Sequence, residues 1–267
     1  MTHHATMVLQ TAALIVVLAT AVAMAAALAF NRLERSTTRA LSHWFGWRSV
    51  MVTGWLGVPA HELSHLAACK ALGLRVVDFR LFAPDPRSST LGYVQFVQEG
   101  RGMGRAVRRF LVGVAPLALG VTLLTVGWLM VFPSALAKLP APPVTGGSMA
   151  GNMSLAGLRS ALAALKGLPV FAKAAHPLFW IYSYLALAVG LHMAPSRADL
   201  KNAVAGGLIT SIGLVGILAL ATVLWPKAAS LAARIVVMAF AALLWTLILT
   251  WLYSMAISGL TWLASRR

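Results

Sequence analysis

The sequence has few acidic residues, little charge of either sign and almost no cysteine. Only six of its 267 residues are Asp or Glu, and charged residues make up 10% of the chain against 60% hydrophobic residues. A soluble globular domain carries about 25% charged residues, so this composition excludes an ordinary soluble domain. The mean hydropathy of +0.82 instead indicates a polytopic membrane protein. A single cysteine, Cys69, excludes an internal disulfide framework.

The shortage of acids leaves a strongly basic chain, with 22 Lys and Arg and a formal net charge of +16. In a soluble protein such an excess would suggest a nucleic-acid partner. Here the cations flank apolar segments and do not gather among exposed aromatic residues, so we expect no nucleic acid. They are typical of juxtamembrane charges, which set topology and contact the headgroups of the lipid bilayer. They are densest between residues 70 and 109, which favours a cytoplasmic location for that side.

Long apolar runs predict about six transmembrane helices. They lie at about residues 7–30, 47–72, 110–132, 176–193, 203–225 and 229–263. The first run is longer than the roughly 7–15 apolar residues of a signal peptide, so we expect a retained membrane helix. The charged stretch Asn31–Arg35 is expected to end that helix, with a linker following. The predicted organisation is an N-terminal helix and linker (1–46), a core (47–202) and two C-terminal scaffold helices (203–267).

The pattern changes after the second apolar run. Residues 75–82 and 91–96 alternate in a strand-like way around a Pro/Asp/Ser-rich turn, which predicts a β-hairpin over about residues 75–96. Residues 133–175 read as a Pro/Gly-rich linker, with one weakly amphipathic piece at about residues 154–165. The expected fold class is an all-α polytopic membrane protein of about six helices with a membrane-associated β-hairpin after the second.

The second run carries the motif H-E-x-x-H, in which His61 and His65 would lie on one face of a helix. Two neutral imidazoles at this spacing can bind one Zn²⁺. Glu62 lies beside that face, the position of a general base that activates water without being a ligand. Ionisable groups are costly in apolar sequence, so this cluster is a functional-site hypothesis. Cys69 continues the stripe but is better explained as a small core residue.

A catalytic zinc takes three protein ligands and keeps one position open, so a third ligand is needed. The second and fourth apolar runs are separated by one crossing, so their C-terminal ends lie on the same side of the membrane. Asp199 and His192 both lie at the end of the fourth run. Asp199 is the preferred ligand because a carboxylate completes a known catalytic zinc set, although it could instead be a helix N-cap. His192 is the runner-up ligand, or a group that supports a ligand or faces the substrate.

Taken together, residues 47–202 resemble the intramembrane site-2 metalloprotease family. The resemblance rests on the H-E-x-x-H motif in a membrane helix, on the hairpin ending in Leu91–Phe96, on the Ala115-Pro116 pair, and on the late aspartate after Pro195. No glycine follows that aspartate, and the asparagine of the family's A-G-P-x-x-N pattern is missing. No PDZ-like or CBS-like domain is present in the sequence.

The resemblance implies His61, His65 and Asp199 as Zn²⁺ ligands, with Glu62 activating water. It implies cleavage of a transmembrane or membrane-proximal segment, commonly of an anti-sigma factor or a membrane-bound regulator. The expected location is a bacterial inner membrane with the active site toward the cytoplasm.

An exposed hairpin edge can capture an unwound peptide by strand addition, so Leu91, Gly92, Tyr93 and Val94 are candidate substrate-binding residues. A surface hairpin with no substrate role is the simpler alternative. The main alternative function is a non-proteolytic metal-binding membrane protein, either an adaptor-type relative or a divalent-metal transporter. A transporter would need polar residues in several helices, and the two C-terminal runs offer almost none.

Overall fold

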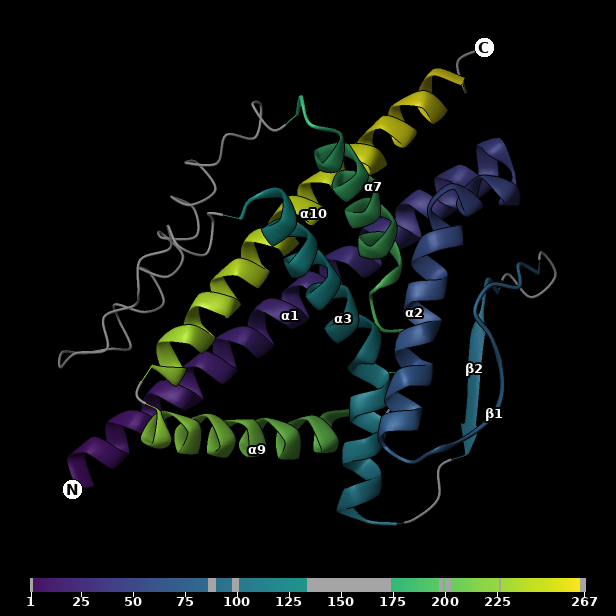
Figure 1. Cartoon of the computed structure of the whole chain (residues 1–267). Coiled ribbons are helices and arrows are strands. Elements are labelled where there is room, and N and C mark those ends of the chain that lie inside the picture. The colour runs from purple at the N-terminus through teal and green to yellow at the C-terminus, as the bar shows by residue number, and fades with distance from the viewer. Residues whose placement is uncertain are drawn as a thin grey trace.

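The computed structural model describes residues 2–85, 90–97, 101–133, 174–196, 199, 203–225 and 227–264. Most of these residues are helical, in line with the expected all-α class (Figure 1). Two long helices, α1 (Thr2–Phe45) and α10 (Ala228–Ala264), pack along each other diagonally across the molecule. Helix α9 (Ala203–Leu224) crosses their lower end and reaches α3 (Met103–Val131). The amphipathic piece predicted at residues 154–165 falls outside the described residues.

The first helix is longer than the sequence predicts. The charged stretch Asn31–Arg35 does not end α1, which continues to Phe45 as one helix. The prediction of a linker there is wrong, because Arg and Glu are good helix formers and bonds one turn apart support the backbone locally. Arg35 donates to both the carbonyl and the side-chain oxygen of Asn31. A charged stretch therefore does not by itself mark the end of a helix.

Among the described residues, four helices are long and apolar enough to cross a membrane, which indicates an integral membrane protein. They contain the spans Ala5–Phe45, Met103–Val131, Gly206–Leu224 and Ala228–Leu263. The short apolar helix α7 (Pro177–His192) and the motif helix α2 (Met51–Ala71) fall outside this set. Helix α7 has only 16 residues, and the polar residues of the motif lower the hydropathy of α2. The membrane class therefore stands, but six spans are not confirmed.

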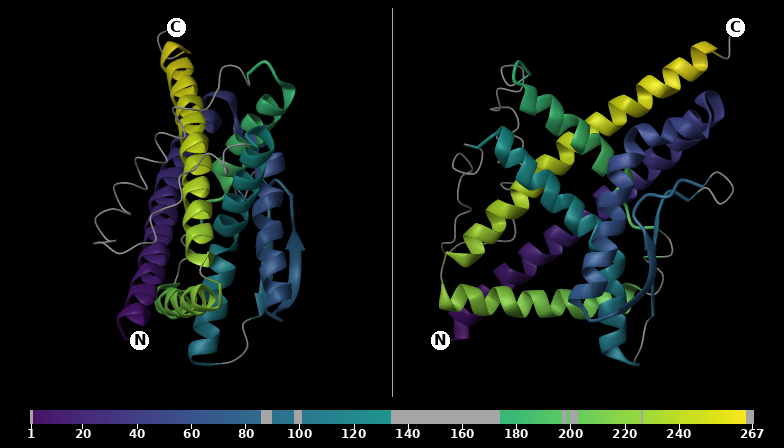
Figure 2. Two further views of the ribbon diagram at one scale, coloured as in Figure 1. Left: turned by 60° about the vertical axis from the view of Figure 1, so that its left-hand side comes forward. Right: turned by 45° about the vertical axis from the view of Figure 1, so that its right-hand side comes forward.

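The predicted β-hairpin is present. Strand β1 (Arg75–Arg80) pairs antiparallel with β2 (Tyr93–Val97), and a bulge lies between Val76 and Asp78. Figure 2 shows the pair running alongside α2, on the flank away from α1. Val76 and Phe96 pack against a small buried cluster formed by Cys69, Leu74 and Val112. The hairpin is therefore attached to the site-bearing helices by apolar contacts on one face.

Helix α2 packs between α3 and α7, and these neighbours place the site. A short 3-10 turn (Trp47–Val50) leads into α2, which continues through Pro59. Gly57 faces α7, and a Cβ atom there would collide with the Ala188 carbonyl oxygen and the His192 ring. The absence of a side chain at this crossing point lets the two backbones approach closely, as small residues do in packed membrane helices. The C-terminal end of α7 is thereby held beside the H-E-x-x-H turn.

Candidate metal centre

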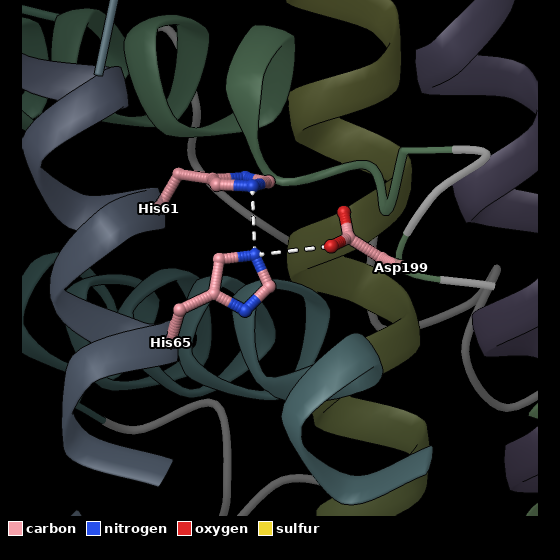
Figure 3. A group of neighbouring side chains, drawn as sticks. All are labelled: His61, His65 and Asp199. Carbon is pink, nitrogen blue, oxygen red and sulfur yellow. Dashed lines mark hydrogen bonds and ion pairs between the residues drawn. The ribbon is translucent and has the colours of Figure 1, made fainter. Parts of the chain in front are cut away.

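The motif histidines lie on one face of α2, as their spacing predicts. Their Nε2 atoms are 3.2 Å apart and their rings meet edge to face (Figure 3). His65 is buried at 7% exposure, and His61 is half-buried. Two imidazole nitrogens therefore point at a common volume inside the protein.

Backbone carbonyls determine which ring nitrogen carries the proton. The Nδ1 of His61 lies 2.6 Å from the His192 carbonyl oxygen, and the Nδ1 of His65 lies 3.0 Å from that of Val112. A carbonyl oxygen can only accept, so each Nδ1 is the donor and each neutral Nε2 presents a lone pair. Two lone pairs facing each other at this distance repel unless a cation lies between them. This carbonyl-oriented arrangement is usual for metal-ligating histidines.

The third donor is Asp199, which arrives from beyond α7. Its Oδ1 lies 3.5 Å from the Nε2 of His65, and the figure shows the carboxylate directed at the histidine pair (Figure 3). Gly113 of α3 makes room for this approach, because a Cβ atom there would collide with the Asp199 carbonyl oxygen. The ligand atoms of His61, His65 and Asp199 all lie within 4.8 Å of one another. The structure therefore brings together the predicted set of three.

The spacing of these atoms suits a small metal ion. Nitrogen and oxygen ligands about 2.0–2.2 Å from a tetrahedral zinc lie roughly 3.3–3.6 Å from each other. The 3.2 Å between the two nitrogens and the 3.5 Å from the His65 Nε2 to the carboxylate oxygen lie close to that edge length, and all three ligand atoms lie within 4.8 Å of one another. Two neutral imidazoles and one carboxylate also form a donor set found in catalytic zinc sites. The three residues fit a metal of this kind.

Glu62 lies beside the group without belonging to it. Its side chain is buried at 9% exposure, and its Cγ lies 2.9 Å from the point where a Cβ atom of Gly92 would stand. The same point is 2.9 Å from the carbonyl oxygens of Arg80 and Leu81. Gly92 therefore lets the hairpin pass directly over the Glu62 side chain. This contact links the predicted general base to the predicted substrate-binding strand.

The other candidate substrate-binding residues of the hairpin, Leu91, Tyr93 and Val94, differ in what they contact. Leu91 packs inward, with its Cδ1 lying 3.4 Å from the position a Gly54 Cβ would take. Val94 pairs with Phe79 in the sheet, whereas the Tyr93 hydroxyl donates to the Asp78 carboxylate at 2.6 Å. That bond lowers the pKa of Asp78 below its ordinary value and raises the pKa of Tyr93. The surface of the hairpin at Tyr93 is therefore polar, and its inner surface is apolar.

The runner-up ligand His192 is used differently. Its Nε2 lies 3.3 Å from the Thr53 hydroxyl, and its backbone carbonyl serves His61. Cys69 is fully buried against Leu74 and Val112, in agreement with its interpretation as a core residue.

Sequence reasoning missed the groups that orient the ligands. The carbonyls of His192 and Val112 carry no sequence signal, because every residue has one. Ser196 also contacts Asp199 through two hydrogen bonds. The signal that could have found it is the S-x-x-D spacing from Ser196 to Asp199, which is that of a capping box. The small residues around Gly113 predict close packing, but the sequence does not predict that Asp199 is the residue packed there.

Comparisons with models of known protein families, with curated proteins and with solved structures find no match for this chain. The residues of the site are therefore the guide to what the protein does.

Proposed function

We propose that this protein is an intramembrane zinc metalloprotease, which hydrolyses a peptide bond within or near a transmembrane segment of a membrane-protein substrate. The observation that carries the proposal is the convergence of two Nε2 lone pairs and one carboxylate, with Glu62 adjacent. Both histidines have their Nδ1 bonded to a backbone carbonyl, which directs both Nε2 atoms at the Asp199 carboxylate and at each other. A purely structural polar cluster would not be expected to leave these atoms facing one another.

Zinc is the metal that this donor set favours. Mg²⁺ and Ca²⁺ prefer sites made of oxygen ligands, whereas imidazole suits borderline metals such as zinc. Three protein ligands leave a tetrahedral site with one open position, which distinguishes catalytic from structural zinc. When bound, the zinc ion would polarise the scissile carbonyl and lower the pKa of a coordinated water.

Glu62 would act as the general base and then as the general acid. Its carboxylate would take the proton of the attacking water and return it to the leaving amine. Its burial under the hairpin at Gly92 limits bulk water around it. His61, His65 and Asp199 would hold the metal at a fixed position relative to the Glu62 carboxylate. General acid–base catalysis of this kind contributes roughly 10²–10⁴-fold to the rate.

The hairpin supports a substrate that binds in an extended conformation. An intact transmembrane helix has all its carbonyls hydrogen-bonded, so it must unwind locally before hydrolysis. An extended segment can then pair with the open edge of a strand. Gly92 contacts Glu62, so a segment bound along residues 91–94 would pass the general base. A membrane-bound regulator or an anti-sigma factor is the substrate class we infer.

We place the protein in a bacterial inner membrane, with the metal centre toward the cytoplasm. The support is the cluster of basic residues near the C-terminal end of α2 and the N-terminal end of α3, which carries Lys70, Arg75, Arg101 and Arg105. Cytoplasmic loops of membrane proteins are enriched in Lys and Arg. His61 and His65 lie in the C-terminal half of α2.

The test measures zinc content and proteolysis together. The purified protein in detergent should contain one zinc per chain and should cleave unfolded casein, used as a generic substrate. Glu62→Gln should keep the zinc and lose roughly 10²–10⁴-fold in cleavage rate. His61→Ala, His65→Ala and Asp199→Ala should lose both. Zinc-free folded native protein, or undiminished cleavage by Glu62→Gln, would refute the proposal.

The same measurements distinguish a protease from a non-proteolytic metal-binding protein. Stoichiometric zinc with no cleavage of casein or of transmembrane model peptides would favour a non-proteolytic metal-binding protein. A transporter would in addition move zinc across vesicle membranes, which a protease would not do.

A further inference from the structure

One residue, His192, connects α7 to α2 through both its backbone and its side chain. Its carbonyl oxygen lies 2.6 Å from the Nδ1 of His61. Its ring Nε2 lies 3.3 Å from the Oγ1 of Thr53. Both Thr53 and His192 are buried, at 3% and 8% exposure. The ring and the carbonyl of one residue thus contact the same helix at two levels.

These contacts lie on a single face of α2. Thr53, Gly57 and His61 follow one another at intervals of four residues, which puts them one above the other on a helix. Gly57, in the middle, lacks the side chain that would collide with the His192 ring and the Ala188 carbonyl oxygen. The middle position therefore allows close approach, and the two outer positions make the hydrogen bonds.

The carbonyl that orients His61 needs an anchor of its own. His192 is the last residue of α7, and the last carbonyls of a helix have no partner within it. Such a carbonyl can shift as the helix end frays, and the imidazole bonded to it would turn with it. The hydrogen bond from Thr53 holds His192 by its side-chain ring, which restricts the movement of its carbonyl.

We propose that Thr53 and His192 form a positioning pair, which sets the orientation of the metal ligand His61 through the His192 carbonyl. The inference rests on the proposed metal binding and goes beyond it by assigning a role to two residues outside the ligand set. The pair contacts neither metal nor substrate in this role. It acts by holding the ring of His61 at the angle at which its Nε2 meets that of His65.

The hairpin shields the pair from water. At the position where Gly54 would carry a Cβ atom, Leu91 Cδ1 is 3.4 Å away and His192 Nε2 is 4.0 Å away. An apolar side chain therefore lies beside the buried hydrogen bond. A hydrogen bond between polar groups withdrawn from water is costly to lose, because its partners are left unsatisfied. This makes the pair a firm anchor for the end of α7.

The experiment compares metal affinities, measured by competition with a chelator on the full-length protein in detergent. Thr53→Val removes the hydroxyl and keeps the side-chain shape, and we expect about ten-fold weaker Zn²⁺ binding at unchanged stoichiometry, because loss of a group that orients a ligand costs about 10–100-fold in affinity. Thr53→Ser keeps the hydroxyl and should bind within about two-fold of native. Thr250→Val is the matched control, a fully buried threonine on α10 whose hydroxyl donates to Thr246.

A second readout separates positioning from general destabilisation. The visible spectrum of the Co²⁺-substituted protein reports ligand geometry, and it should change in Thr53→Val but not in Thr53→Ser or Thr250→Val. His192→Gln keeps a hydrogen-bonding side chain and the carbonyl, and it provides a further variant if Thr53→Val does not fold.

Native affinity and a native Co²⁺ spectrum in folded Thr53→Val would overturn the positioning role while leaving the proposed function intact. Equal weakening in Thr250→Val would also overturn it. Absence of metal from the native protein would overturn both proposals together.

Discussion

Ser196 and Asp199 bond each other reciprocally. The Ser196 N–H donates to Asp199 Oδ2 at 2.7 Å, and the Asp199 N–H donates to Ser196 Oγ at 3.2 Å. This is the pattern of a capping box, formed here with an aspartate three residues after the serine. It engages one carboxylate oxygen and leaves Oδ1 for His65. In this pattern Ser196, and not Asp199, has the N-cap role, and the bonds to Ser196 are compatible with Asp199 as a metal ligand.

Ser196→Ala should weaken metal binding by roughly ten-fold, because it removes the acceptor that holds the Asp199 backbone. The variant should remain folded, since the Ser196 N–H can still donate to Oδ2. Zinc affinity by chelator competition measures the effect. Ser183→Ala on α7 is the control, because its hydroxyl donates to the Phe179 carbonyl and touches no ligand. Equal affinities in the two variants would refute the role of Ser196.

Gly113→Ala should reduce metal binding by at least ten-fold. The added Cβ atom would collide with the Asp199 carbonyl oxygen and push the third ligand away from His65. Gly104→Ala is a closely matched control on the same helix, where the nearest atom is the end of the flexible Arg108 side chain at 4.0 Å. Alanine favours a helix over glycine by about 1 kcal/mol, so the control should not lose stability. Native zinc affinity in folded Gly113→Ala, measured by chelator competition, would contradict the placement of Asp199.

Gly92→Ala should impair proteolysis without removing the metal. Its Cβ atom would stand 2.9 Å from the Cγ of Glu62 and from two hairpin carbonyl oxygens, so the strand must move away from the general base. A displacement of about 1 Å can cost roughly 10²-fold in rate. Casein cleavage and zinc content are measured in parallel. Gly213→Ala, in open space on α9, serves as the control. Loss of zinc in Gly92→Ala would show instead that the hairpin supports the ligands.

Tyr93→Phe should raise the pKa of Asp78 toward its ordinary value near 4. The Tyr93 hydroxyl stabilises the ionised carboxylate, which is why the pKa of Asp78 is lowered in the folded protein. A lowered folded-state pKa contributes stability that is present above the unfolded value and lost as pH falls through the folded value. Carbon NMR of the labelled carboxylate checks the shift. An unchanged pKa in Tyr93→Phe would place the cause elsewhere, first in the hydrogen bond from the Phe79 N–H and then in Arg80.

Much of the site followed from periodicity and composition. The four-residue spacing of His61 and His65 places both on one helix face wherever that helix lies, because the helical repeat is a local property. Counting crossings put the end of α7 on the same side as the motif. The hairpin followed from alternation and turn residues.

Local sequence rules fail where the membrane and the backbone make different demands. The charged stretch at 31–35 does not end α1, because charge opposes burial in lipid and does not oppose helical backbone. The six predicted spans are not confirmed, because α2 carries the polar motif and α7 is short.

The sequence by itself determined which side chains have ligand chemistry, and which of them share a helix face. Only the tertiary structure decided that Asp199 meets His65 while His192 bonds Thr53. Both lie near the same helix end, and their separation depends on how closely backbones approach at Gly57 and Gly113. The backbones can approach this closely because glycine has no side chain at the points where they cross. No local pattern encodes which partner will occupy the space a glycine leaves.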